Sequence, residues 1–190
     1  MIYSTNQLRD KYQNYKNSGA KIGLEVTKGN LIRLKRNLYA DSLTEKKEVV
    51  ANALYRPSYL SFDYALAYYG LIPERVYSFT SAITEKHKNK QYDNKFGTFT
   101  YQNIPSSVFP YGIITLNESY QIASKEKALA DKLYSLPPAT SLKELKKLLF
   151  EWLRLDEDGF AHLSQDDLRF LLPKYKCQNC SLLLKMIGEK

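Results

Sequence analysis

The sequence predicts an α+β protein, and three features of it point to that class. In the middle of the chain, apolar residues at helical spacing, such as Phe62, Leu66 and Tyr69, precede β-formers over Val76–Ile83. Gly and Pro separate these runs, so the elements are short. After Pro137 the chain becomes helical and leucine-rich. We therefore expect a mostly antiparallel sheet flanked by helices, followed by a helical C-terminal segment.

Residues 1–42 predict a small N-terminal domain. A first helix is expected over Thr5–Lys16 and a short second helix over Lys21–Lys28. The β-formers of Leu31–Tyr39 lie on both sides of a turn at Lys35-Arg36-Asn37. Two helices followed by a basic hairpin predict a winged helix-turn-helix, here shortened because little chain precedes the second helix.

Positive charge is concentrated in this first part. Residues 1–40 contain eight Lys and Arg against two acidic residues, whereas the other 150 residues contain 20 basic and 18 acidic residues. A local basic field is what neutralisation of DNA phosphates requires, although lysine-rich surfaces are often only solubilising. The expected DNA contacts are Lys21, Lys28, Arg33, Lys35 and Arg36, with Arg9 and Lys16 as outer phosphate contacts.

Residues 43–136 predict the α+β core domain. A helix over Leu43–Tyr55 precedes the stretch Pro57–Ala82, in which Ser61 occupies an expected N-cap and Asp63 follows in the first turn. Gly70 is expected to end that helix in a left-handed conformation, and Pro73 prevents its continuation. A basic segment, Thr84–Lys95, reads as an exposed hairpin loop between Val76–Ile83 and Thr98–Ile104.

Two further strands, Ile113–Leu116 and Tyr120–Ala123, are expected across the turn Asn117-Glu118-Ser119, before a helix capped by Ser124. Residues 137–190 predict helices whose apolar face docks on the core. The expected apolar residues of the first of these helices are Leu142, Leu145, Leu148, Leu149, Trp152 and Leu153. Ser164 with Asp167 predicts the start of a later helix.

Four segments carry a resemblance to a known family. They are Gly29–Tyr39, Pro57–Ala82, Phe96–Tyr101 with Ile104-Pro105, and Ile122–Asp131. In this order and spacing they resemble the AbiEi-type antitoxins, the DNA-binding antitoxins of type IV toxin–antitoxin and abortive-infection systems. The resemblance covers roughly residues 20–135. Asn37 replaces the glycine usual at the hairpin turn of that family, a mild departure because Asn tolerates positive φ.

The resemblance implies a protein that binds double-stranded DNA at its own operator and represses its own operon. It also implies a functional partner, a nucleotidyltransferase-like toxin that is countered with or without a stable complex. A homo-oligomer on the DNA would be ordinary for such a regulator. The alternative is a DNA-binding transcriptional regulator or phage-defence accessory without antitoxin activity.

A third class, a nucleic-acid enzyme, has little support in the sequence. No nucleophile motif, phosphate-binding loop or zinc-protease motif is present, and His87 and His162 lack a catalytic context. A metal-dependent carboxylate set would have to come from Asp63, Glu74, Asp93, Glu126 and Asp131. We expect no catalytic residues, no cofactor and no metal.

Two cysteines form the single Cys177-Gln-Asn-Cys180 motif. A zinc site needs about four ligands, and thioredoxin-like use would need a βαβ pattern around the pair, so two reduced thiols near a C-terminal helix are expected. The sequence contains neither a long apolar run nor a signal-peptide pattern, which predicts a cytoplasmic protein that does not enter membranes.

Overall fold

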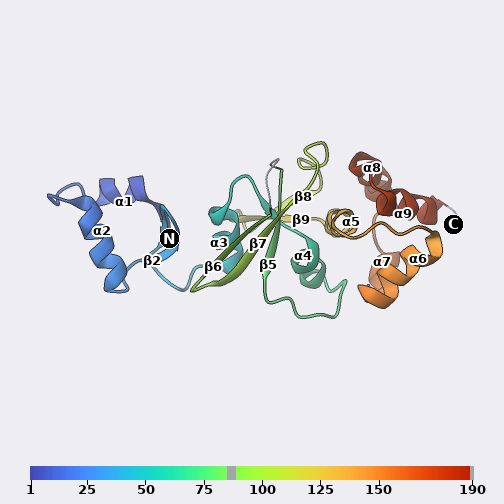
Figure 1. Cartoon of the computed structure of the whole chain (residues 1–190), viewed down its shortest axis with the longest axis horizontal. Helices are drawn as coiled ribbons and strands as arrows, with labels where there is room; N and C mark the ends of the chain where they lie inside the picture. Colours follow the sequence, from blue (N-terminus) through green and yellow to red (C-terminus); the bar gives the residue numbers. More distant parts are fainter. Residues whose placement is uncertain (85–88, 189–190) are drawn as a thin grey trace.

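The structure, a computed structural model, describes residues 1–84 and 89–188. A small N-terminal lobe, a central sheet with its helices, and a group of C-terminal helices follow one another along the long axis of the molecule (Figure 1). The protein is thus α+β. None of the helices in the described part combines the length and apolar composition needed to cross a bilayer.

The N-terminal lobe consists of a three-stranded antiparallel sheet and two helices. Its elements are β1 (Ile2–Ser4), α1 (Thr5–Lys11), α2 (Ser18–Thr27), β2 (Ile32–Lys35) and β3 (Leu38–Ala40), with sheet order β1-β3-β2. The sequence analysis missed β1 and made the first helix too long. Ser4 begins α1 in a reciprocal capping box with Gln7, and Asn17 caps α2, so the two helix starts are locally encoded.

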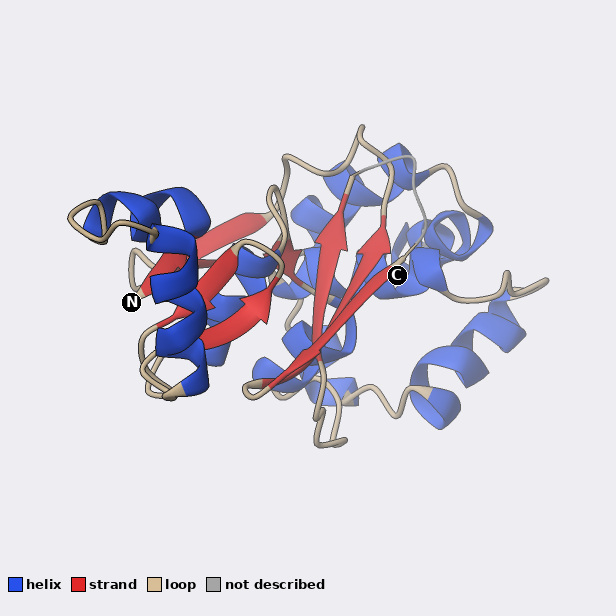
Figure 2. Ribbon diagram, turned by 60° about the vertical axis from the view of Figure 1, so that its left-hand side comes forward, coloured by secondary structure: helices blue, strands red, loops and turns tan. Residues whose placement is uncertain are grey.

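The two faces of this small sheet have different partners. The row Tyr3, Tyr39 and Arg33 lies on one face, where Tyr3 and Tyr39 pack with Leu8 and Ile22 of the helices. The row Ile2, Ala40 and Ile32 lies on the other face and belongs to the main core. The helices α1 and α2 therefore cover the face that points away from the body of the protein (Figure 2).

The central sheet has six strands and is mixed. Its strands are β4 (Tyr59–Leu60), β5 (Phe79–Ile83), β6 (Lys90–Asn94), β7 (Gly97–Asn103), β8 (Ile113–Leu116) and β9 (Tyr120–Ala123), in the order β6-β7-β5-β4-β9-β8. The pairs β5–β7 and β4–β9 are parallel, and the other three are antiparallel.

Part of the expected loop over residues 84–95, residues 85–88, lies outside the described residues, and the prediction is wrong for Lys90–Asn94, which forms the edge strand β6. The additional strand β6 is antiparallel to β7. As a result, β7 lies beside β5 and runs parallel to it. The expected hairpin between these two segments is thus a parallel pair. The β8–β9 hairpin is confirmed at its predicted residues.

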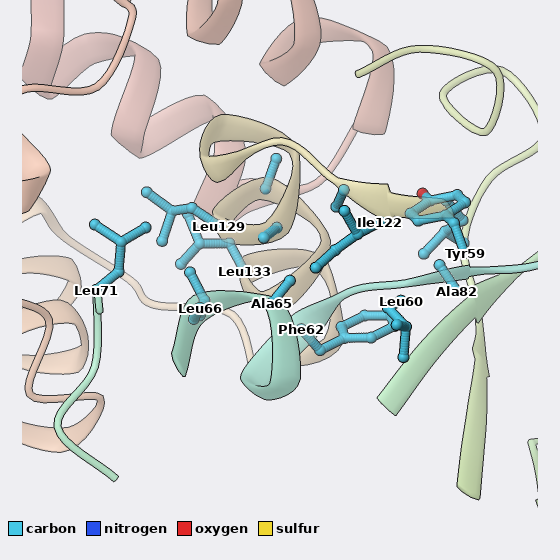
Figure 3. Close-up of a cluster of buried hydrophobic side chains, with 14 of the residues drawn as sticks. Tyr59, Leu60, Phe62, Ala65, Leu66, Leu71, Ala82, Ile122, Leu129 and Leu133 are labelled. Atoms are coloured by element: carbon cyan, nitrogen blue, oxygen red, sulfur yellow. The ribbon is translucent and has the colours of Figure 1, made fainter. Parts of the chain in front are cut away.

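Three helices cover the sheet: α3 (Lys47–Leu54), α4 (Phe62–Tyr68) and α5 (Lys125–Ser135). Ala65 and Leu66 of α4 pack toward Leu129 and Leu133 of α5, and all four side chains are fully buried (Figure 3). Gly70 has φ +69° at the end of α4, as the sequence predicts. The apolar stripe of the central segment is thus a core, not a binding face.

The C-terminal part comprises α6 (Leu142–Lys147), the π-helical turn η1 (Leu148–Trp152), α7 (Glu157–Ala161), α8 (Gln165–Tyr175) and α9 (Gln178–Gly188). Leu145 and Leu149 are fully buried in the main core. Trp152, which was expected on the same face, is 76% exposed. The wider π turn changes the angular spacing of side chains, so Trp152 at its end leaves the buried stripe, whereas Leu153 directly after it still packs against the main core.

Candidate nucleic-acid interface

The helix α2 presents an open face at the far side of the N-terminal lobe. Its buried residues are Ile22 and Glu25, while Ala20, Gly23 and Leu24 are exposed. A Cβ atom added at Gly23 would meet no atom within 4 Å. Small outward residues such as Ala20 and Gly23 let the helix approach another surface closely, which insertion into a DNA groove requires.

Lys21 is already occupied by a partner within α2. Its Nζ lies 2.7 Å from Oε1 of Glu25, and Asn30 Nδ2 donates to Oε2 of the same carboxylate at 2.8 Å. The hydrogen bond with Lys21 lowers the pKa of Glu25, and the same contact raises the pKa of Lys21. Lys21, which the sequence analysis expected to contact DNA, is therefore a paired cation in this structure.

Lys35 points toward the body of the protein. Its Nζ donates to the carbonyl of Leu54 at the end of α3 and lies 5.5 Å from the ring centre of Tyr92. Burial, followed by the nearby charge of Lys90, lowers the pKa of Lys35. The register shifts between Arg33 and Lys35, which breaks the alternation of the strand and places Lys35 against the core. The sequence spacing did not distinguish Arg33 from Lys35, and the sequence analysis expected both to contact DNA.

The remaining expected cations are exposed. Within the described residues none of them forms an ion pair with an acidic group. They are Arg9, Lys16, Lys28, Arg33 and Arg36.

The hairpin turn is attached to the start of α1. The N–H of Thr5 donates to the carbonyl of Asn37 at 3.2 Å, and Thr5 Oγ1 donates to Asn37 Oδ1 at 3.3 Å. Asn37 has φ +65°, as its position in the turn predicts. Asn37 and Arg9 line one shallow depression, so the structure brings Arg9 next to the turn that carries Arg36. Lys16 lies apart from them, in the α1–α2 connection.

The five carboxylates considered for a metal-dependent enzyme have separate roles. Asp63 pairs with Lys132, Glu74 with Arg154, and Asp93 accepts from Thr98. Glu126 accepts the N–H of Ser164, and Asp131 is buried. Within residues 1–84 and 89–188 no three His, Cys, Asp or Glu side chains are grouped for a metal ion. His162 is exposed, and His87 lies outside the described residues.

Asp131 is the centre of a buried polar cluster that the sequence analysis did not foresee. Its Oδ2 accepts from Tyr59 at 3.0 Å and from Ser61 at 2.6 Å. Its Oδ1 accepts from Tyr175 at 2.6 Å and lies 3.1 Å from Nζ of Lys127. The available signal was the spacing of Lys127 and Asp131, one turn apart on a helix between apolar residues.

Burial dominates the electrostatics of this cluster. It lowers the pKa of Lys127, and the charge of Asp131 only partly opposes that shift. Burial together with the Asp131 carboxylate raises the pKa values of Tyr59 and Tyr175. Lys127 and Asp131 are both inaccessible to solvent, and the cluster joins β4, α5 and α8. Its position suits a structural link between the central and C-terminal parts.

No protein-family model matches the chain, and no curated protein matches it either.

Proposed function

We propose that the chain is a DNA-binding antitoxin of a type IV toxin–antitoxin system that represses its own operon. In this proposal the N-terminal lobe is a winged helix-turn-helix: α2 enters the major groove, and the β2–β3 hairpin follows the phosphates. The larger body counters a nucleotidyltransferase-like toxin, as the resemblance to AbiEi-type antitoxins implies.

The observation that carries the DNA-binding part is the set of unpaired cations around an open helix. The face of α2 formed by Ala20, Gly23 and Leu24 is uncovered. Arg36 and Arg9 lie at the hairpin turn and the adjacent helix, and Lys28 follows α2. Free cations gain more from phosphate contact than paired ones, because no internal ion pair has to be broken first.

The contact set of the proposal is accordingly smaller than the one expected from sequence. Arg33, Arg36 and Lys28 are the principal phosphate contacts, with Arg9 and Lys16 as outer ones. Lys35 supports the attachment of the hairpin to the body, because its ammonium binds the end of α3. Lys21 fixes Glu25 and Asn30 at the junction between α2 and β2.

A DNA-binding regulator without antitoxin activity is the second candidate. The geometric support belongs to the N-terminal lobe, and a regulator without a toxin would use that lobe in the same way. Genome neighbourhood separates the two candidates, since a nucleotidyltransferase gene directly downstream favours an antitoxin.

Two experiments test the two levels of the proposal. Gel-shift titration with the DNA upstream of the chain's own gene is expected to give specific binding that competitor DNA does not remove. Expression of the neighbouring gene alone is expected to be toxic, and co-expression of this chain is expected to remove the toxicity. Specific DNA binding without any effect on toxicity would support the plain regulator, and loss of both effects would refute the proposal.

A further inference from the structure

Cys177 and Cys180 stand at the start of α9. Lys176, with φ +50°, ends α8 in a left-handed conformation, and Cys177 follows immediately before α9. The N–H of Ser181 donates to the carbonyl of Cys177 at 3.0 Å, which makes Cys177 the residue that opens the helix. Cys180 follows three residues later, so the helical spacing places the two thiols on the same side of the helix start.

The two thiols differ in accessibility. Cys177 is half-buried, whereas Cys180 is fully buried with its Sγ 3.9 Å from the carbonyl of Ala130 in α5. Between them, Asn179 donates to the carbonyls of Leu133 and Pro137, each at 3.0 Å. The start of α9 is therefore held firmly against the end of α5, and the pair has a fixed geometry.

The environment also favours the thiolate of Cys177. The thiol of Cys180 and the N–H groups of Cys180 and Asn179 lower the pKa of Cys177 to about 7. The neighbouring Cys177 and burial raise the pKa of Cys180. An accessible cysteine of low pKa beside a buried second cysteine is the arrangement of reactive dithiols, whereas purely structural buried cysteines are inert.

We propose that Cys177 and Cys180 form a redox-active dithiol site whose co-substrate is a low-molecular-weight disulfide such as oxidised glutathione. Cys177 is the attacking thiol, and Cys180 is the resolving thiol. The sequence analysis expected two reduced thiols near a C-terminal helix, because no βαβ pattern surrounds the motif. The start of α9 places an accessible and a buried cysteine one helical turn apart without a βαβ fold.

The exchange proceeds in two balanced steps. The Cys177 thiolate attacks one sulfur of the glutathione disulfide, forms a mixed disulfide and releases one glutathione thiolate. The Cys180 thiol then attacks Cys177 Sγ and forms the internal disulfide, and its proton passes to the leaving sulfur, so the second glutathione is released as a thiol. The protein pair loses two electrons, and the glutathione disulfide gains them. In the second step the negative charge of Cys177 is gone, which removes one of the causes that raise the pKa of Cys180.

The experiment uses the full chain, which contains no other cysteine. Reduced protein is incubated with oxidised glutathione, free thiols are alkylated in acid-quenched samples, and intact masses are measured. The wild type is expected to lose both alkylatable thiols without retaining glutathione. Cys180→Ala is expected to accumulate one glutathione at Cys177, and Cys177→Ala is expected to stay unmodified.

A second measurement on the wild type does not depend on the folding of any variant. The rate of Cys177 alkylation is followed against pH and is expected to be half-maximal near pH 7. Retention of glutathione by the wild type, or equal modification of Cys177→Ala and Cys180→Ala, would overturn the proposal. A half-maximal rate at the pH of an ordinary thiol, about 8.5, would overturn it as well.

Discussion

Nζ of Lys127 lies 3.1 Å from Oδ1 of Asp131, one turn away on α5, and neither side chain is exposed to solvent. The carboxylate also has three hydroxyl donors, from Tyr59, Ser61 and Tyr175. Removal of the carboxylate would thus leave a buried cation and several hydroxyl groups without their acceptor, whereas removal of the cation leaves the carboxylate solvated by hydroxyl groups.

We therefore expect Asp131→Leu to destabilise the fold by about 3–5 kcal/mol, and Lys127→Met to cost less. The double variant is expected to be more stable than Asp131→Leu alone, because no unpaired charge remains buried. Urea unfolding of the three variants measures these differences. Equal losses in the two single variants would contradict the assignment of Asp131 as the centre of the cluster.

The hydroxyl group of Thr80, in strand β5, caps the start of α4. Ser61 occupies the N-cap position but gives its hydroxyl to Asp131, and the N–H of Tyr64 instead donates to Oγ1 of Thr80 at 3.1 Å. Thr80→Val, which keeps the shape and removes the acceptor, is expected to cost about 1–2 kcal/mol of folding stability. Thr80→Ser is expected to retain most of that stability. Thermal unfolding of both variants checks the expectation, and an unaffected Thr80→Val would refute it.

The Lys21–Glu25 pair predicts an acid-sensitive N-terminal lobe. The folded-state pKa of Glu25 is lowered, so the stabilisation is present above the unfolded pKa and is lost as pH falls through the folded one. The pKa of Lys21 is raised, so its part persists until alkaline pH. Urea unfolding of wild type and Glu25→Gln between about pH 6 and pH 3 should show a stability difference that disappears at the acid end. A difference that stays constant over this range would contradict the pairing.

A substitution at Lys35 distinguishes a structural cation of the hairpin from one that contacts DNA. Lys35→Met keeps the aliphatic stem and removes the ammonium that binds the carbonyl of Leu54. We expect it to lower folding stability by about 0.5–1.5 kcal/mol while leaving the salt dependence of DNA binding unchanged. Parallel unfolding and gel-shift titrations of this variant provide the check. A flatter salt dependence would return Lys35 to the set of phosphate contacts.

Much of the central fold can be read from local signals. Gly70, Asn37 and Ser124 mark turns and a helix start through their own backbone and side-chain chemistry, and the structure has them in those roles. The hairpin of β8 and β9 likewise follows from its turn and its β-formers. These features depend on neighbours in sequence, which the sequence displays directly.

Non-local pairing decided the rest. The strand β6 is polar and belongs to the sheet only because β7 offers it an edge, so residues 90–94 looked like a loop. The register shift before Lys35 and the pairing of Lys21 with Glu25 also depend on atoms placed by the fold. Arg33 and Arg36 are exposed, and their role as DNA contacts stays a prediction.

In the proposed function, the N-terminal lobe binds duplex DNA through its unpaired cations. The most direct test is the salt dependence of binding to the upstream DNA for wild type, Arg33→Ala and Arg36→Ala, with Lys146→Ala on the distant α6 as a charge-matched control. We predict that each N-terminal variant weakens binding and reduces the slope of log K against log salt by about 0.9, while the control keeps the wild-type slope. Slopes equal to wild type in both Arg variants, or an equal reduction in the Lys146 control, would contradict it.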